Sequence, residues 1–278
     1  MDVKFLDVGQ GDAILIEYPN GKNALIDAGR SDSVIDAALK AEGIRKIDSG
    51  QIHTTQTYQA YLDAIDASGA KFEVAEIGDN VSDDSNASAT VLAVESNAAD
   101  SSEGSIVIML TYGLTDFLLT GDAGLEAEDY LMARYDDLEA EILKVSHHGS
   151  ATGTGGDFIE AASPQDAILS YGDNAYGHPH NEVVQDLLNY DANVYSTHEQ
   201  GTIEINTIGN SYTINVDPWR DGNKPTPAPA PTPAPKPTPK PVEPEYQTFN
   251  NLKITAKNLK TDVVTIKNTG STNVKMKG

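Results

Sequence analysis

Carboxylate and imidazole side chains follow two apolar runs that lie close together in the sequence. The run at residues 117–119 is followed by Asp122, and the run at residues 142–145 is followed by His147 and His148. Taken alone, a Gly-Asp pair is typical of a turn, and two adjacent histidines are typical polar loop residues. Brought together, a carboxylate and imidazoles form a donor set that can hold a divalent metal ion. The chemistry therefore depends on whether the fold brings the two runs side by side.

A predicted amphipathic helix separates these two runs. Its apolar residues recur at spacings close to 3.6: Leu125, Leu131, Met132 and Tyr135. The pattern is strand, helix, strand, and the two strands of such a unit are parallel neighbours. Their carboxyl ends emerge at the same edge of the sheet. We therefore predict that Asp122 lies beside His147 and His148.

Two further histidines follow a third predicted strand, at residues 167–171. This strand leads into a loop rich in Gly and Pro that carries His178 and His180, and a helix is predicted at residues 182–189. Histidines in such a constrained loop act either as acid/base and phosphate-contacting groups or as rigid turn residues. Because the loop belongs to the same sheet edge, we favour a functional role for both.

The rest of the first 220 residues is predicted to alternate between short strands and helices. Strands at residues 3–6, 13–18 and 23–26 form a β-meander, in which Asp12 is interpreted as a turn-former. A helix at residues 33–42 ends before Gly43, and a second helix covers residues 55–68. The remaining predicted strands cover residues 71–76, 90–95, 106–112, 193–196, 202–206 and 212–216, and a short helix covers residues 158–162.

Five strings in this region resemble the metallo-β-lactamase superfamily. They are FLDVGQGDA at residues 5–13, LIDAG at 25–29, FLLTGD at 117–122, LKVSHHGS at 143–150 and YGHPHNEV at 176–183. The most similar branch is formed by the C-terminal hydrolase domain of bacterial competence DNA-uptake proteins and its secreted relatives. The resemblance runs in order over residues 3–216, and several linked motifs are more specific than one short pattern.

The resemblance implies an α/β fold, an αββα sandwich with a metal site at one edge between two sheets. It implies metal-dependent hydrolysis of the phosphodiesterase or nuclease kind, with zinc or manganese as cofactor and nucleic acid or another phosphodiester as substrate. Asp122 and His148 match metal ligands of the superfamily, and Asp27 matches an aspartate that orients the metal-binding histidines from outside. His147 is then predicted to contact the substrate.

One defining motif of the superfamily is absent from the sequence. Its His-x-His-x-Asp-His run follows a strand after the first helix, whereas here residues 43–48 lead directly into residues 49–55. Compared with the superfamily, the sequence lacks a strand, the metal-binding loop and the beginning of the helix that follows it. It also lacks the next metal-binding histidine, which is expected before residues 117–119. We therefore predict weak or no binding of zinc or manganese and negligible phosphodiesterase activity. The alternative is a non-catalytic extracellular binding or surface-attached module derived from this fold.

Charge is distributed unevenly along the chain. Residues 1–220 contain ten Lys and Arg against thirty-eight Asp and Glu, and the remaining residues contain nine against four. An acidic body repels polyanions, and nucleic-acid-binding surfaces normally carry clustered Lys and Arg. Tight binding of DNA would therefore require divalent cations or the basic tail. The alternative explanation of the acidity is solubility in salty or alkaline surroundings.

The absence of cysteine and the length of the apolar runs limit the possible metal ligands and the cellular location of the protein. The chain contains no cysteine, which excludes disulfides and thiolate ligands, so that a metal must be held by His, Asp or Glu. No apolar run reaches the length of a membrane span, and no export signal is visible at the start of the sequence. We expect an extracytoplasmic or secreted protein.

Composition divides the chain into three regions. Residues 1–220 form the predicted metallo-β-lactamase-like domain, and residues 221–247 form a Pro-rich linker, in which ten of the fourteen prolines lie between Pro225 and Pro244. Such a repeat is predicted to be an extended, polyproline-like spacer. Residues 248–278 contain predicted strands at 253–256 and 263–267 and resemble the opening part of a lamin-tail-type immunoglobulin-like domain. A complete sandwich needs about seven strands, so the tail is predicted to be partial and to offer contact to a cell-surface partner.

Overall fold

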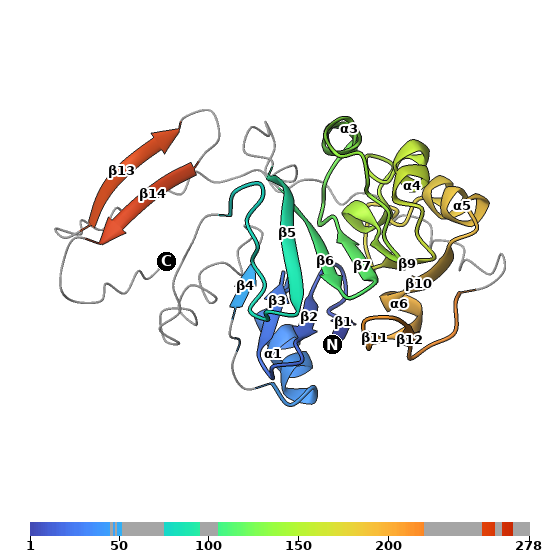
Figure 1. Cartoon of the computed structure of the whole chain (residues 1–278), viewed down its shortest axis with the longest axis horizontal. Coiled ribbons are helices and arrows are strands. Elements are labelled where there is room, and N and C mark those ends of the chain that lie inside the picture. The colour runs from blue at the N-terminus through green and yellow to red at the C-terminus, as the bar shows by residue number, and fades with distance from the viewer. Residues whose placement is uncertain are drawn as a thin grey trace.

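Two six-stranded sheets face each other, with helices on both outer sides (Figure 1). The computed structural model describes residues 1–44, 47, 49–51, 75–94 and 105–219, and the backbone of two strands at residues 252–258 and 263–268. Helix α1 packs on one sheet and helices α3, α4 and α5 pack on the other. This layering confirms the predicted α/β class and the αββα sandwich.

The first sheet has the strand order β12-β11-β1-β2-β3-β4. Its strands are β1 (Asp2–Phe5), β2 (Ile14–Glu17), β3 (Asn23–Ile26), β4 (Ser49–Gln51), β11 (Ile203–Thr207) and β12 (Tyr212–Ile214). Strands β1, β2 and β3 form the predicted antiparallel meander, and β11 returns to pair with β1. Strand β4, which is parallel to β3, was not predicted, because Ser-Gly-Gln contains none of the β-branched or aromatic residues that favour strands.

The second sheet has the strand order β10-β9-β8-β7-β6-β5. Its strands are β5 (Ala87–Val94), β6 (Ile106–Tyr112), β7 (Thr115–Leu119), β8 (Ile142–Lys144), β9 (Asp166–Leu169) and β10 (Asn193–Ser196). Strands β5, β6 and β7 are antiparallel, whereas β7, β8, β9 and β10 are parallel to one another. The predicted strand-helix-strand unit is β7-α3-β8, and its strands are parallel neighbours as expected.

The helices of the described part agree with most of the sequence predictions. They are α1 (Asp32–Ala41), α3 (Leu125–Arg134), α4 (Gly156–Ala162), α5 (Asn181–Asn189) and α6 (Thr197–Gln200). Helix α6 was not predicted, because four residues are too short to show a 3.6-residue period. The helix predicted at residues 55–68 lies outside the described residues, as does most of the strand predicted at 71–76. None of the described helices is long and apolar enough to cross a membrane.

Alternating side chains of the second sheet fill two separate cores. Ile142 packs between the two sheets, with Phe5 and Phe117, whereas Leu143 packs under the helices, with Leu131. This alternation follows from the two-residue period of a strand. Each fully buried apolar side chain contributes about 1.5–3 kcal/mol. The same alternation fixes the direction of the side chain at position 144. This position lies two residues after Ile142, so its side chain must again point toward the first sheet.

The two described strands near the C-terminus form a hairpin. Strand β13 (Leu252–Asn258) pairs antiparallel with β14 (Val263–Asn268), which confirms the strands predicted at residues 253–256 and 263–267. The linker predicted at residues 221–247 lies outside the described residues. The resemblance of the tail to a lamin-tail-type domain stays a prediction.

Candidate functional site

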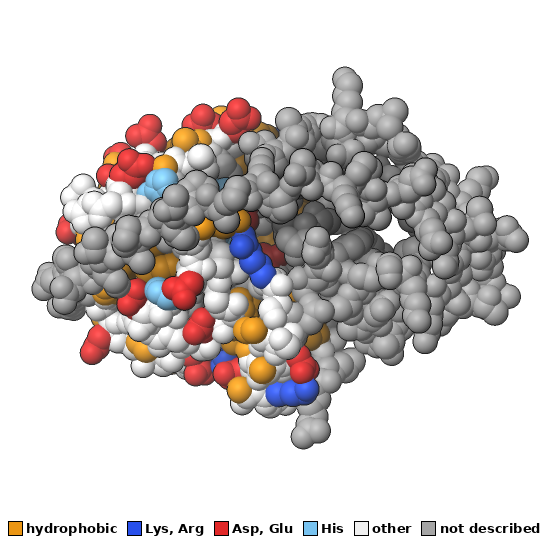
Figure 2. Space-filling view, turned by 180° about the vertical axis from the view of Figure 1, so that it is seen from behind, with side chains coloured by type: hydrophobic (Ala, Val, Ile, Leu, Met, Phe, Trp, Pro, Cys, Tyr) orange, Lys and Arg blue, Asp and Glu red, His pale blue; other side chains and the backbone are white. Residues whose placement is uncertain are grey.

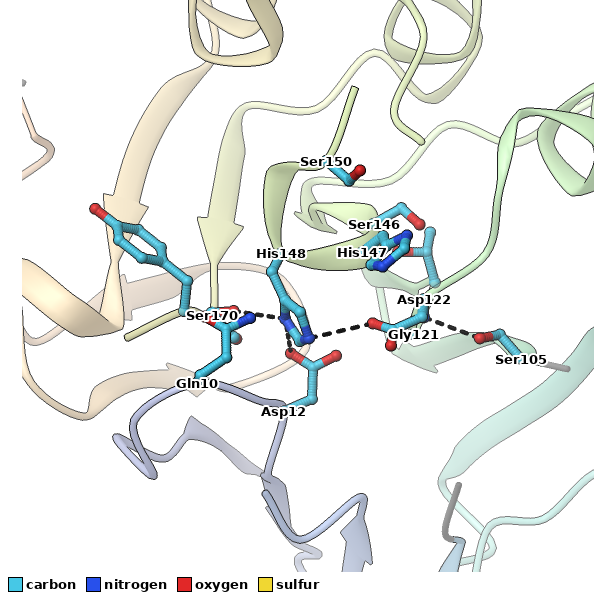
Figure 3. A network of polar contacts seen from close by, with 12 residues as sticks. Gln10, Asp12, Ser105, Gly121, Asp122, Ser146, His147, His148, Ser150 and Ser170 are labelled. Atoms are coloured by element: carbon cyan, nitrogen blue, oxygen red, sulfur yellow. Dashed lines mark hydrogen bonds and ion pairs between the residues drawn. The ribbon is translucent and has the colours of Figure 1, made fainter. Parts of the chain in front are cut away.

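Three side chains from both sheets meet at one edge of the sandwich (Figure 3). His148 follows β8 and Asp122 follows β7, and the distance from His148 Nε2 to Asp122 Oδ1 is 3.4 Å. Asp12, from the turn between β1 and β2 of the other sheet, places Oδ1 3.6 Å from His148 Nδ1. Asp122 and His148 thus converge as the parallel strand ends predict. Asp12, which the sequence presented only as a turn-former, joins them.

The turn that carries the two adjacent histidines has an unusual backbone. His147 (φ 46°), His148 (φ 58°) and Gly149 (φ 78°) all adopt left-handed conformations. A non-glycine residue held there costs of order 1–3 kcal/mol, and such residues cluster at functional sites. The backbone N–H of His147 donates to Gly121 O at 3.0 Å, which ties the turn to the residues that follow β7. The strained turn therefore holds His147 and His148 next to Asp122.

A backbone carbonyl fixes the orientation of the His148 ring. Nδ1 lies 2.8 Å from Ser170 O, and because a carbonyl oxygen can only accept, Nδ1 carries the hydrogen and donates it. Nε2 then faces Asp122. Burial alone would lower the pKa of His148, but the Asp12 and Asp122 carboxylates outweigh it and raise this pKa. Metal-binding histidines are commonly held in this way, with the outer nitrogen donating to a carbonyl.

Asp12 is buried and forms an ion pair with a buried lysine. Lys144 Nζ lies 2.6 Å from Asp12 Oδ2, and the two side chains are 0% and 4% exposed, respectively. Lys144 also donates to Gly121 O at 2.9 Å. Burial alone would raise the pKa of Asp12, but the Lys144 ammonium and His148 outweigh it and lower this pKa to about 2. Asp12 is therefore a carboxylate at any physiological pH.

His178 completes a cluster of four imidazole rings. Its ring centroid lies 5.4 Å from that of His147, 6.4 Å from that of His148 and 5.5 Å from that of His180. Burial and the three neighbouring histidines lower the pKa of His178 to about 4. Burial also lowers the pKa of His147, whose Nδ1 lies 3.3 Å from Thr152 Oγ1. His178 is therefore neutral at pH 7, and its Nδ1 is a buried atom without a hydrogen-bond partner among the described residues.

Two other predicted site residues lie at the margin of this cluster. Asp27 follows β3 with φ 56°, and the turn that it starts packs against the site because Gly29 N donates to Asp12 O at 2.8 Å. Asp27 contributes no atom to the group formed by Asp12, Asp122 and His148, so its outer orienting role stays a prediction. His180 Nδ1 lies 3.9 Å from Glu182 Oε1, at the start of α5.

The donor set fits one divalent cation. Within the described residues, Asp12, Asp122 and His148 are the only group of three potential ligands, and one atom of each lies within 4.8 Å of the others. Oδ1 of Asp12 and Oδ1 of Asp122 are buried without a hydrogen-bond partner there, which an ion would correct. Zinc bonds of 2.0–2.2 Å in a tetrahedron place neighbouring ligand atoms roughly 3.4 Å apart. The separation of His148 Nε2 from Asp122 Oδ1 agrees with this value.

A buried glutamate supports the loop behind the histidine turn. Glu128 of α3 is 2% exposed, and its carboxylate accepts the backbone N–H groups of Thr154 and Gly155. Thr154 Oγ1 in turn accepts the N–H of Ser146, the first residue of the turn, at 2.8 Å. The sequence does contain a signal for Glu128, because it lies three residues before Leu131 on the apolar stripe of the helix.

We expect Glu128 to make the stability of the domain depend on pH. Burial raises the pKa of Glu128 from 4.5 to about 7, although its two N–H contacts oppose the shift. Between these values the folded state binds the proton more tightly than the unfolded state, so the contribution of Glu128 to the free energy of unfolding falls by about 3 kcal/mol as pH rises from 4.5 to 7. Denaturant titrations across this range should show a shallower decline for Glu128→Gln than for wild type. Glu126→Gln, an exposed change on the same helix, serves as control, and equal slopes for wild type and Glu128→Gln would refute the assignment.

Parts of this sequence are similar to a known protein family and to known proteins. Residues 98–173 match the family model described as the Metallo-beta-lactamase superfamily. The chain is 27% identical over 267 residues to ComE operon protein 3 of Bacillus subtilis (strain 168), an alignment that covers 78% of this chain and 34% of that protein. It is 39% identical over 88 residues to Competence protein ComA of Neisseria gonorrhoeae, which covers 31% of this chain and 13% of that protein. The chain thus spans about a third or less of the length of these relatives.

A structural comparison aligns the chain with a solved protein. The metallo-beta-lactamase fold protein YhfI from Bacillus subtilis matches over 73% of this chain and 100% of its own, with 11% sequence identity and a TM-score of 0.47.

Proposed function

We infer the function of this chain from its family: it belongs to the metallo-β-lactamase superfamily, in the branch that contains bacterial competence proteins. We propose that it is a phosphodiesterase-type member of this hydrolase family that holds one divalent cation weakly and has lost most of its turnover. The observation that carries the proposal is the convergence of Asp12, Asp122 and His148 in a sequence without a His-x-His-x-Asp-His run.

Asp12, Asp122 and His148 would hold the cation. Zinc or manganese bound there would supply Lewis acidity, which makes a phosphoryl group easier for water to attack at neutral pH. The protein's own contribution is orientation. Ser170 O fixes the His148 ring through Nδ1, and Ser105 Oγ accepts the backbone N–H of Asp122 at 2.9 Å. These contacts aim the imidazole Nε2 and the Asp122 carboxylate at each other.

The neighbouring histidines can contact a water or a substrate near the cation site. His178 is neutral at pH 7, because its pKa is about 4, and it can therefore accept a hydrogen bond from a nucleophilic water but is a weak base and cannot serve as an acid. His147, whose ring lies next to it, is the better placed group to contact the substrate. Arg30 stacks over Tyr176 with 5.4 Å from its guanidinium carbon to the ring centroid, and the Tyr176 ring lies 5.6 Å from that of His178. A phosphate near the histidines would thus meet a local positive charge.

Two features limit catalysis in this chain. The described residues provide one group of three ligands, whereas a two-metal phosphodiesterase site needs two adjacent sets. The surface is also acidic: Figure 2 shows many Asp and Glu side chains and few Lys and Arg on the described part of one face. Such a surface slows the approach of a polyanion. We therefore propose small phosphodiesters rather than long DNA as the better substrates.

Hydrolysis of bis-p-nitrophenyl phosphate and of single-stranded DNA, with added Mn²⁺ or Zn²⁺, tests the proposal. We expect negligible turnover, because losing even the outer partners of metal ligands costs roughly 10–100-fold in metal affinity or activity. The residual rate should disappear in Asp122→Ala/His148→Ala. His198→Ala, a histidine outside the cluster, is the matched control and should retain the rate.

Each outcome of this assay decides between the two functions that remain. Turnover in the range typical of enzymes, about 1–1000 per second, would contradict the proposed impairment. A residual rate that survives in Asp122→Ala/His148→Ala would show that these residues do not form the working site. No rate in any variant would favour the second function, a non-catalytic binding or surface-attached module, which the missing histidine run and the acidic surface also support.

A further inference from the structure

The site contains a positive charge that belongs to the protein itself. Lys144 is fully buried, and its ammonium contacts Asp12 Oδ2 and Gly121 O at 2.6 and 2.9 Å. Lys144 follows Ile142 by two positions on β8, so it points toward the first sheet, as Ile142 does. It therefore reaches across the sandwich from the second sheet to the turn between β1 and β2. Burying a lysine on a parallel strand destabilises the folded state unless its charge is paired, and Asp12 is the partner of Lys144.

We propose that Lys144 is a built-in counter-ion of the group formed by Asp12, Asp122 and His148: it holds Asp12 in place without a divalent cation and weakens the binding of one. The inference rests on the cation site of the proposed function and is independent of hydrolysis.

The geometry allows the Asp12 carboxylate to contact Lys144 and a cation at the same time. Oδ2 is occupied by the Lys144 ammonium, whereas Oδ1 is buried without a hydrogen-bond partner among the described residues and faces His148. Any cation held by Oδ1 would therefore share one carboxylate with an ammonium group. A histidine that binds a metal must be neutral, so two carboxylates and one ammonium leave a single net negative charge for the bound ion. Both the shared ligand and the repulsion from Lys144 lower the affinity.

The same contact explains how the site stays ordered without a full set of metal ligands. In the absence of any cation, the buried Asp12 carboxylate and the partly buried Asp122 carboxylate would repel each other, and His148 is the only ionic partner that they share among the described residues. The Lys144 ammonium neutralises one of them and links the two sheets at the point where the site forms. The domain can therefore fold with the site assembled and no ion bound.

Lys144→Met in the full chain tests this inference through stability and binding rather than activity. Without divalent ions, the melting temperature should fall by several degrees or more, because Asp12 becomes a buried charge without a partner. Added Mn²⁺ or Zn²⁺ should raise the melting temperature of the variant much more than that of wild type. Isothermal titration with each metal should give a dissociation constant about 100-fold lower than the wild-type value.

Three further variants make the result decisive. Lys144→Gln removes the charge but keeps a hydrogen-bond donor, and it should shift metal affinity in the same direction. Lys144→Met/Asp12→Asn removes both charges, so stability without metal should recover and the gain in affinity should vanish. Lys144→Met/Asp122→Asn should lose the gain as well, which assigns the ion to this site.

The proposal is overturned if Lys144→Met and Lys144→Gln bind Mn²⁺ and Zn²⁺ no more tightly than wild type. It is also overturned if neither variant folds even with metal present, since the ion should replace the missing ammonium. Tighter binding in these variants together with an inactive wild type would support this inference and contradict only the hydrolytic function. Unchanged metal binding in these variants together with metal-dependent hydrolysis by wild type would contradict this inference and support the hydrolytic function.

Discussion

Gly172→Ala is expected to lower the free energy of unfolding by about 3 kcal/mol or more. A Cβ atom at this position would lie 2.5 Å from the carbonyl carbon of Gly9 and 2.6 Å from the backbone nitrogen of Gln10. Overpacking costs typically 1–3 kcal/mol, and here both neighbours are backbone atoms that cannot rotate away. Equilibrium denaturation of the variant and wild type at one pH measures the change directly.

The expected effect reaches the site because of where the contact lies. Gly172 follows β9 in the second sheet, and Gln10 belongs to the turn between β1 and β2 that also carries Asp12. Gly172 N donates to Gln10 Oε1 at 3.2 Å, so moving these segments apart also moves Asp12 from His148. Gly156→Ala is the control, because its added Cβ would lie 3.8 Å from Tyr190, an ordinary contact. Equal stability of Gly172→Ala and wild type would show that the two sheets do not approach as closely as described.

Gly149→Ala is expected to cost about 3 kcal/mol of stability and to abolish metal-induced stabilisation. Gly149 has φ 78°, and its added Cβ would lie 2.5 Å from Pro179 Cβ and 2.9 Å from Leu169 Cδ2. The substitution therefore combines backbone strain with a steric clash. Gly149 O also accepts the N–H of His180 at 2.8 Å, so the loop that carries His178 should shift with the turn. Thermal melts with and without Mn²⁺ measure both effects.

Gly177→Ala separates the two causes of this loss. Gly177 has φ 84° but no atom within 4 Å of its added Cβ, so the substitution introduces strain without a clash. We expect it to cost about 1 kcal/mol and to leave the metal response unchanged. If both glycine variants lose the same stability and respond equally to metal, the close packing of Gly149 on Pro179 has no role in shaping the site.

Local patterns in the sequence were sufficient for the elements that lead to Asp122 and His148. Apolar runs bounded by turn residues marked β7 and β8, and the helical period between them required parallel strands with adjacent ends. The convergence of Asp122 and His148 follows from that arrangement alone. Their roles, and those of His147, His178, His180 and Asp27, are not decided by geometry and stay predictions.

The part of the site that sequence reasoning missed depends on contacts distant in sequence. Asp12 follows Gly-Gln-Gly, a pattern that indicates a turn, and its partner Lys144 lies on the other sheet. One signal was present: Lys144 interrupts a strand that is otherwise apolar, and a lysine at an inward position requires a buried acid. Nothing in the sequence identifies that acid, because its selection depends on how the two sheets are stacked. Glu128 was missed for a similar reason, since the loop that it holds comes from beyond the next strand.

The pairing of β1 with β11 governs the order in which this domain can assemble. Strands β1, β2 and β3 are consecutive and can form early through local contacts, whereas β1 meets β11 only after some two hundred intervening residues have been synthesised, as the pairing of Val3 with Ile205 shows. Long-range pairing of this kind slows folding. Until β11 arrives, one side of β1 is an unpaired strand edge, and such edges recruit strands from other chains. A nascent or shortened chain that lacks β11 therefore exposes this edge, and the pairing of β11 with β1 protects the protein from self-association.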